Sequence, residues 1–162
     1  MTPPVSGRQR VVLDTNVVLD LFLFGDAASL DLRDALQAGD IQWIATAHMR
    51  AELLRVLDYP SVRAQAERFK VETDQVLAAF DRWSEVMAPA APAQTFTCSD
   101  PDDQPFVDLA VAHGVWLISK DKAVLQVARA LRLRGAAARV MPPREFALAQ
   151  ANAGLRPGLG AI

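Results

Sequence analysis

The sequence predicts an α/β fold, in which helices cover both faces of a parallel sheet of four to five strands. Short apolar runs such as Val11–Leu13 and Val115–Ile118 alternate with longer stretches of helical periodicity, which is the pattern of repeated strand–helix–strand units. The chain of 162 residues has the length of one domain. With 51% apolar and 22% charged residues, its composition is that of an ordinary globular protein.

The predicted elements begin and end at residues that favour a boundary. Gly39 and Gly114 follow predicted helices, where glycine readily adopts the left-handed conformation that ends a helix. Thr46 can cap the next helix through its hydroxyl, and the proline at position 60 breaks the chain after it. The predicted strands are 10–13, 41–45, 94–97, 115–118 and 139–140, and the predicted helices are 16–24, 28–38, 46–57, 61–69, 72–87, 100–113, 121–134 and 142–151.

The two ends of the chain differ in composition from the domain predicted at 10–151. Residues 1–9 are polar with two prolines, and 152–162 contain several glycines and a proline, so both are expected to be flexible tails. Cys98 is the single cysteine, which excludes an internal disulfide and favours a reducing compartment. Since no apolar run reaches the length of a membrane helix, we expect a cytoplasmic protein with no membrane partner.

Carboxylates recur where the predicted strands and helices meet. Asp14 follows the first strand, Glu52 lies in the helix after the second, Asp103 ends the acidic run 100–103, and Asp121 follows the fourth strand. Because the carboxyl ends of parallel strands form the ligand-binding edge of an open α/β sheet, we expect these acids to gather there. Gathered carboxylates repel one another unless a hard cation lies among them, and Mg²⁺ and Mn²⁺ prefer oxygen ligands. The pattern therefore favours a metal site suited to phosphoryl chemistry.

Each acid also has an ordinary structural role open to it. Asp14 can cap a helix, Glu52 can pair with Arg55, and Asp100 and Asp102 can cap the helix that follows them. Asp103 is distinguished because it lies near the apolar face of that helix. The joint placement of the acids, rather than any one of them, favours the metal site.

The segments that carry these acids resemble the motifs of the PIN-domain nucleases, in the order of that family. No single segment is very specific, but four in order at fitting separations are. The resemblance covers roughly residues 10–147, and the third motif has the form found in a branch of toxins from toxin–antitoxin pairs. The four segments are V-V-L-D-T-N-V-V-L at 11–19, T-A-H-M-R-A-E-L-L at 46–54, D-P-D-D-Q-P-F-V-D-L-A at 100–110 and L-I-S-K-D at 117–121.

This resemblance implies a small α/β/α endoribonuclease that depends on Mg²⁺ or Mn²⁺. It assigns both metal binding and catalysis to four carboxylates, Asp14, Glu52, Asp103 and Asp121. It further implies that two polar residues orient carboxylates or water, namely Asn16 and Ser119. The implied partners are RNA and, for a toxin, a cognate antitoxin protein, with a homodimer as a further expectation.

Two residues depart from the family pattern without removing a ligand. Ser119 stands where the family usually has threonine, and Lys120 stands where the toxin branch often has glycine. Lys120 is also one of three cations close in sequence to the acids, together with Arg50 and Lys122. These three side chains are the expected contacts for RNA phosphates.

Two other functions remain open at the level of sequence. A haloacid-dehalogenase-like phosphatase also has an aspartate after its first strand, but it needs a second one two residues later, where this chain has Asn16. A PIN-like module that binds RNA or protein without cleaving is the other alternative. The net charge of −2 does not distinguish between these functions. The two histidines lack the partners that a zinc site or a Ser–His–Asp triad would need.

Overall fold

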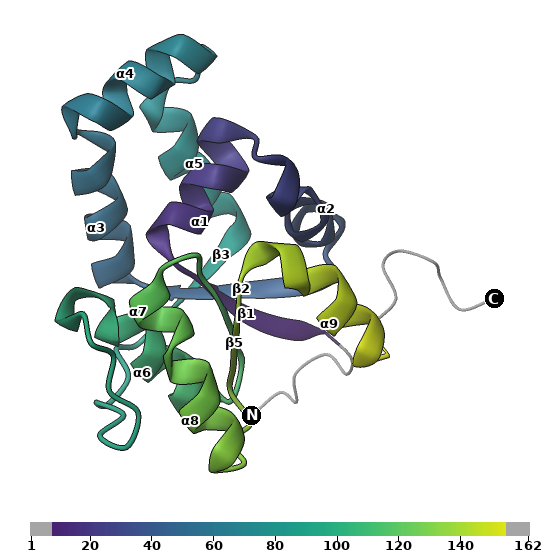
Figure 1. Cartoon of the computed structure of the whole chain (residues 1–162). Coiled ribbons are helices and arrows are strands. Elements are labelled where there is room, and N and C mark those ends of the chain that lie inside the picture. Colours follow the sequence, from purple (N-terminus) through teal and green to yellow (C-terminus); the bar gives the residue numbers. More distant parts are fainter. Residues whose placement is uncertain (1–7, 155–162) are drawn as a thin grey trace.

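The computed structural model describes residues 8–154 and shows an α/β domain built on a five-stranded sheet (Figure 1). The strand order is β3-β2-β1-β4-β5, and each neighbouring pair is parallel. The predicted fold class is thereby confirmed. The strands are β1 (Gln9–Leu13), β2 (Ile41–Thr46), β3 (Ser84–Met87), β4 (Trp116–Ile118) and β5 (Arg139–Met141).

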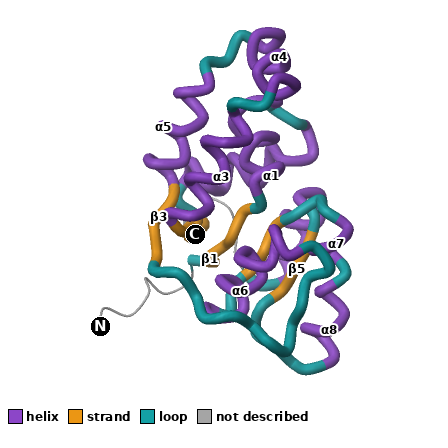
Figure 2. The backbone as a smooth tube through the Cα atoms, turned by 90° about the vertical axis from the view of Figure 1, so that its left-hand side faces the viewer, coloured by secondary structure: helices purple, strands orange, loops and turns teal. Residues whose placement is uncertain are grey.

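Helices lie on both sides of this sheet. In Figure 1, α1, α2 and α9 lie on one side, and α6 and α8 lie on the other. Figure 2 shows α4 at the end of the molecule farthest from the strands, where it joins α3 to α5. The helices are α1 (Thr15–Leu19), α2 (Leu30–Ala38), α3 (Ala47–Leu57), α4 (Pro60–Phe69), α5 (Thr73–Trp83), α6 (Gln104–His113), α7 (Lys122–Leu125), α8 (Val127–Leu133) and α9 (Phe146–Asn152).

The centre of the sheet is the centre of the core. Val11 and Val12 of β1 and Leu117 and Ile118 of β4 have no exposed surface. Strands of a parallel sheet that are covered on both faces need continuous apolar runs rather than alternation. These runs fix β1 and β4 side by side, so Leu13 is paired with Ile118 and both strands end at the same edge.

Several predicted boundaries are confirmed. Thr46 precedes α3, and its Oγ1 accepts a hydrogen bond from the backbone N–H of Met49 at 3.3 Å. Gly39 and Gly114 follow α2 and α6 in the left-handed conformation, with φ of +80° and +64°. Each therefore ends its helix and turns the chain into the next strand.

The prediction of the third strand at 94–97 is wrong, as is the helix predicted over 72–87. The helix α5 ends at Trp83, and the third strand is β3, which follows it directly. The apolar residue Met87 lies four residues after Trp83, a spacing that also fits a helix, and the prediction therefore extended the helix through β3. The residues of this edge strand are half-buried or exposed. Residues 94–97 instead form a loop held by side chains, since Gln104 Nε2 donates to the carbonyl of Phe96 at 2.9 Å.

Smaller differences concern the ends and faces of helices. The helix predicted over 16–24 is α1 followed by a π-helical segment at Asp20–Phe24, and the helix predicted over 121–134 is divided at Gln126. Leu54 of α3 is 51% exposed, whereas its neighbour Leu53 is buried. The tails predicted at 1–9 and 152–162 lie almost wholly outside the described residues. Within 8–154, no helix is long and apolar enough to span a bilayer.

Candidate metal centre

The strand ends bring Asp14 and Asp121 to one edge of the sheet. Asp14 follows β1, and its backbone N–H donates to the carbonyl of Ile118 at the end of β4, at 3.0 Å. Asp121 lies three residues after Ile118, where it caps α7. Two segments that are distant in sequence are thus joined by backbone hydrogen bonding beside the two carboxylates.

Three carboxylates at this edge form a tight group, which we call the acidic cluster: Asp100, Asp103 and Asp121. One oxygen of each lies within 4.8 Å of the others. Asp100 Oδ1 accepts from the N–H of Asp102 at 3.0 Å, and Asp121 Oδ1 accepts from the N–H of Ala123 at 2.8 Å. These backbone contacts fix two of the three carboxylates in place before any ligand arrives.

Asp103 is the most strongly perturbed group of the acidic cluster. Burial raises its pKa to about 7, and the charges of Asp14, Asp121 and Asp100 add to the effect. Its Oδ2 atom is buried and has no hydrogen-bond partner among residues 8–154. A buried oxygen without a donor, facing other carboxylates, is the environment that a divalent cation with oxygen ligands would satisfy.

Ser119 connects Asp14 to Asp121. It has no exposed surface, and its Oγ donates to Asp14 Oδ2 at 2.6 Å while accepting from the N–H of Asp121 at 3.0 Å. Burial raises the pKa of Asp14, and the charges of Asp121 and Glu52 add to this, whereas the hydrogen bond from Ser119 opposes it. Ser119 therefore orients one acid and supports the backbone of another.

Glu52 is held beside Asp14 by a residue that the sequence interpretation did not select. Thr15 Oγ1 donates to Glu52 Oε2 at 3.1 Å, and Arg55 lies 3.8 Å from Oε1. Asn16, which was expected to orient a carboxylate, is exposed, and no side-chain hydrogen bond of it is seen in the described part of the chain. Thr15, the first residue of α1, is thus the side chain that contacts Glu52, and the role expected for Asn16 stays a prediction.

The structure also adds Asp100 to the predicted acids. Sequence reasoning treated Asp100 as a cap only, and the carboxylate does cap the turn Pro101–Asp103 through Oδ1. A carboxylate has two oxygens, so the same side chain also belongs to the acidic cluster. The sequence feature that could have indicated this role of Asp100 is the run D-P-D-D, which contains more acidic residues than a helix cap requires.

The three predicted phosphate contacts have different surroundings. Arg50 forms a two-pronged ion pair with Asp81 of α5, with N–O distances of 2.7 and 2.9 Å. Lys120 Nζ lies 2.5 Å from Oδ2 of the nearly buried Asp20. Lys122 is exposed at the start of α7. Of the three, Lys122 is the one without an ion-pair partner among residues 8–154.

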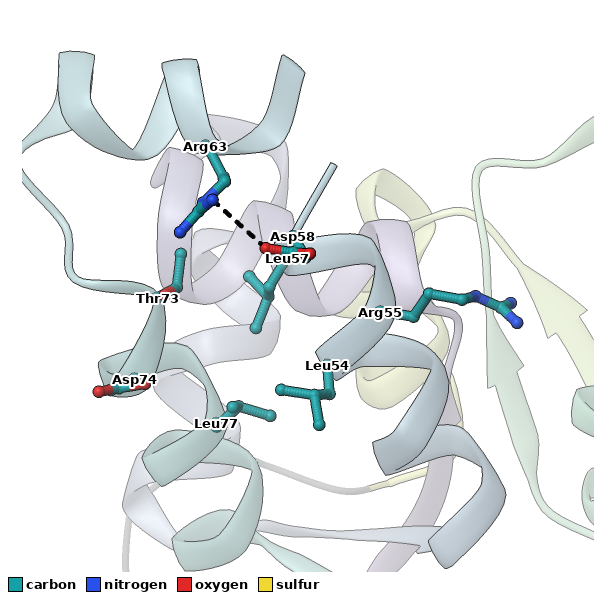
Figure 3. Close-up of a pocket in the computed structure, with 8 residues that line it drawn as sticks. All are labelled: Leu54, Arg55, Leu57, Asp58, Arg63, Thr73, Asp74 and Leu77. Carbon is teal, nitrogen blue, oxygen red and sulfur yellow. Dashed lines mark ion pairs between the residues drawn. The ribbon is translucent and has the colours of Figure 1, made fainter. Parts of the chain in front are cut away.

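A pocket of about 290 Å³ between α3, α4 and α5 lies apart from these carboxylates (Figure 3). An ion pair of 3.4 Å between Asp58 and Arg63 crosses its rim, and Leu54 and Leu77 line its floor. The guanidinium of Arg55 points away from the other labelled side chains. This pocket has mixed charges and an apolar floor, and it lacks the concentration of oxygen ligands found at the edge of the sheet.

Comparison with known proteins places the sequence of this chain in one family. A family model described as PIN domain matches residues 10–123, which is more than half of the chain. The matched range contains every acid placed at the sheet edge. No curated protein matches the chain.

Proposed function

This chain belongs to the PIN-domain family, whose members are generally nucleases, and from that premise we propose that it is an endoribonuclease dependent on Mg²⁺ or Mn²⁺. The observation that carries the proposal is the buried, unpartnered Oδ2 of Asp103 among neighbouring carboxylates. Without a cation this arrangement is unfavourable, because burial and like charges both oppose ionisation. A divalent cation removes both penalties at once.

Asp14, Asp103 and Asp121 are the proposed metal ligands, with Asp100 as an additional oxygen donor. Ser119 keeps Asp14 in position, and backbone N–H groups keep Asp100 and Asp121 in position. Support for this assignment comes from the raised pKa of Asp14 and of Asp103, since each is raised by burial and by the neighbouring acids. A bound ion would polarise the phosphate and lower the pKa of a coordinated water.

Glu52 has a separate proposed role. Thr15 directs its carboxylate, and its charge reaches Asp14, but it is not part of the acidic cluster. At this position it would accept a hydrogen bond from the water that attacks the phosphodiester, and so orient it. Lys122 is the proposed contact for the RNA backbone, and Lys120 and Arg50 would contribute only after leaving their acidic partners.

The test is cleavage of a mixed single-stranded RNA pool with Mg²⁺, Mn²⁺ or EDTA. Asp14→Asn should abolish cleavage because it removes a ligand without changing volume, whereas Asp31→Asn, the same change at an exposed residue of α2, should not. Mn²⁺ should also raise the melting temperature of the wild type and not that of Asp14→Asn, since an ion bound to the folded state stabilises it. Full cleavage by Asp14→Asn would refute the assignment.

The absence of both effects would support the other function considered above. If no metal permits cleavage and Mn²⁺ leaves the melting temperature unchanged, a PIN-like module that binds RNA or protein is the better description. The melting experiment needs no knowledge of the RNA target. It therefore separates a protein without a metal from a nuclease whose substrate is missing from the pool.

We further propose that the nuclease is the cytoplasmic toxin of a toxin–antitoxin pair, with an antitoxin protein as partner. Support for this comes from the form of the segment at 100–110 and from no feature of the geometry. Induced expression of the chain should arrest growth, and expression of Asp14→Asn should not. The homodimer belongs to the same proposal, and sedimentation of the purified chain measures it directly.

A further inference from the structure

A separate pocket opens at the same edge of the sheet as the acidic cluster. Its volume is about 390 Å³, which lies within the usual range of small-molecule sites, about 300–1000 Å³. We call it the His48 pocket. Its lining residues come from the start of α3, the loop after β3 and the first turns of α6: Thr46, His48, Pro89, Ala90, Pro105 and Asp108.

The His48 pocket adjoins the proposed catalytic residues through two helices. His48 and Glu52 are four residues apart on α3, so they lie on the same side of that helix, one turn from each other. Pro105 follows Asp103 by two residues at the start of α6. Figure 2 shows the loop after β3 running toward α6, and Pro89 and Ala90 of this loop line the pocket.

The walls of the pocket suit a flat aromatic ring. Pro89, Ala90 and Pro105 are apolar, and His48 adds an aromatic ring that is exposed and makes no side-chain hydrogen bond within residues 8–154. Unpaired bases of single-stranded RNA are held by stacking on such side chains. The apolar walls and the histidine together match a nucleobase better than a phosphate.

Asp108 supplies the polar group of the pocket. The residue is 9% exposed, and its Oδ1 accepts from the N–H of Ala93 at 2.8 Å and from Gln104 Nε2 at 2.9 Å. No hydrogen bond to Oδ2 is found in the described part of the chain. Two donors hold the carboxylate in one orientation, and its second oxygen remains able to accept from a ligand.

We propose that the His48 pocket binds one nucleobase of the RNA strand beside the cleaved phosphate, with a preference for guanine. This inference rests on the proposed endoribonuclease function. Guanine presents a ring N–H and an amino group side by side, so both can donate to the two lone pairs of Asp108 Oδ2, whereas uracil has one ring N–H between two acceptors. Stacking on His48 would hold any base, and Asp108 would discriminate among them.

Binding can be measured without cleavage, by titrating the metal-free full chain with guanosine, adenosine, cytidine or uridine. The chain has 2 histidines, so a ¹H–¹³C spectrum of the imidazoles reports on His48 with His113 as an internal control at the other end of α6. Guanosine should shift the His48 signals and bind roughly tenfold more tightly than uridine. The His113 signals should not move.

Two substitutions connect this binding to cleavage. His48→Ala should raise KM for guanine-containing RNA roughly tenfold, the size of one lost base–aromatic stack, with kcat nearly unchanged. His113→Ala removes the same side chain away from the pocket and should leave KM unchanged. Ala90→Phe fills the pocket, so it should reduce both guanosine binding and guanine preference.

The proposal is overturned if no nucleoside shifts the His48 signals, or if all four bind equally and His48→Ala leaves KM unchanged. These outcomes are distinct from failure of the endoribonuclease itself. Guanosine binding with no RNA cleavage in any metal would support the base site and refute the proposed endoribonuclease. Metal-dependent cleavage without nucleoside binding would support the endoribonuclease and refute the base site.

Discussion

Ser119 and Asp14 lie 105 residues apart in sequence and are joined by a hydrogen bond of 2.6 Å between buried atoms. The same hydroxyl accepts the N–H of Asp121, so one oxygen atom sets the relative position of two acids. The contact links the ends of β1 and β4, which are paired up to Leu13 and Ile118. The register between β1 and β4 therefore also determines how Asp14 and Asp121 lie relative to each other.

Ser119→Ala should lower activity and Mn²⁺ affinity by roughly 10–100-fold, because groups that orient metal ligands typically contribute this much. Asp14 would then lose the hydroxyl that orients it, and the N–H of Asp121 would lose its acceptor. Ser119→Thr keeps the hydroxyl and should retain most of the affinity. Calorimetric titration with Mn²⁺ measures the effect, and equal affinities for Ser119→Ala and the wild type would contradict it.

Asp103→Asn should stabilise the metal-free protein above neutral pH. The folded protein keeps the Asp103 proton up to about pH 7, whereas the unfolded chain releases it near 3.8. Between these values the unfolded state binds fewer protons, so the contribution of Asp103 makes the free energy of unfolding fall as pH rises. The melting temperature of Asp103→Asn in EDTA should exceed that of the wild type at pH 8, and the two should converge near pH 4.

Asp102→Asn is the matched control for that experiment, since Asp102 is the exposed neighbour of Asp103. It should change the melting temperature little at either pH. Added Mn²⁺ should reverse the order, because the wild type gains a ligand-bound state that Asp103→Asn lacks. A lower melting temperature for Asp103→Asn at pH 8 in EDTA would count against the buried, repelled carboxylate.

Lys120→Met should destabilise the fold by about 1–3 kcal/mol at neutral pH, because it leaves the carboxylate of Asp20 nearly buried without its cation. Burial already raises the pKa of Asp20, and the loss of Lys120 would raise it further. The destabilisation should therefore be smaller at pH 4 than at neutral pH, because protonation of Asp20 removes the unpaired charge. Urea unfolding at the two pH values gives the comparison.

The double variant Asp20→Asn, Lys120→Met tests the cause of that loss. If an unpaired buried charge is responsible, neutralising Asp20 should restore most of the lost free energy of unfolding. A double variant as unstable as the sum of the two single changes would show that the residues act independently.

The Lys120→Met variant also tests the proposed phosphate contacts. If it binds RNA as tightly as the wild type, Lys120 is not one of them.

Gly114→Ala should cost more stability than Gly39→Ala, although both glycines are left-handed. The left-handed backbone alone costs about 1–2 kcal/mol for alanine, and at Gly39 nothing lies within 4 Å of an added Cβ. At Gly114 the added Cβ would meet the Cβ of Ala137 at 3.1 Å, so the segment before β5 would also have to move. Thermal unfolding of the two variants measures the difference.

Most of the fold could be predicted because buried parallel strands have continuous apolar sequences. Val11–Leu13 and Val115–Ile118 are such runs, and both were located. The edge strand β3 was not, because it is four residues long and only partly buried. The other edge strand, β5, was predicted at 139–140, but β3 follows α5 directly and was read as part of that helix.

The site could be predicted only as far as the acids follow strand and helix boundaries. Asp14, Asp103 and Asp121 are adjacent to such boundaries, and the structure places all three at one edge. Asp100 was interpreted only as a helix cap, and Thr15 was not among the predicted site residues. Their contacts depend on side-chain direction and on tertiary distance, which a sequence pattern does not contain. The metal role of Asp100 is still a prediction, as are the roles of Asp14, Glu52, Asp103 and Asp121.

The strand order has a consequence for the time at which Asp14 and Ser119 can first meet during synthesis. β1 is made first but lies beside β4, so Asp14 receives its hydroxyl partner only after 105 further residues have been synthesised. At about 5–20 residues per second, that interval is roughly 5–20 s. On the proposed function, a nascent chain would therefore keep Asp14 apart from Ser119 and Asp121 until β4 has been made, and could not cleave RNA before that point.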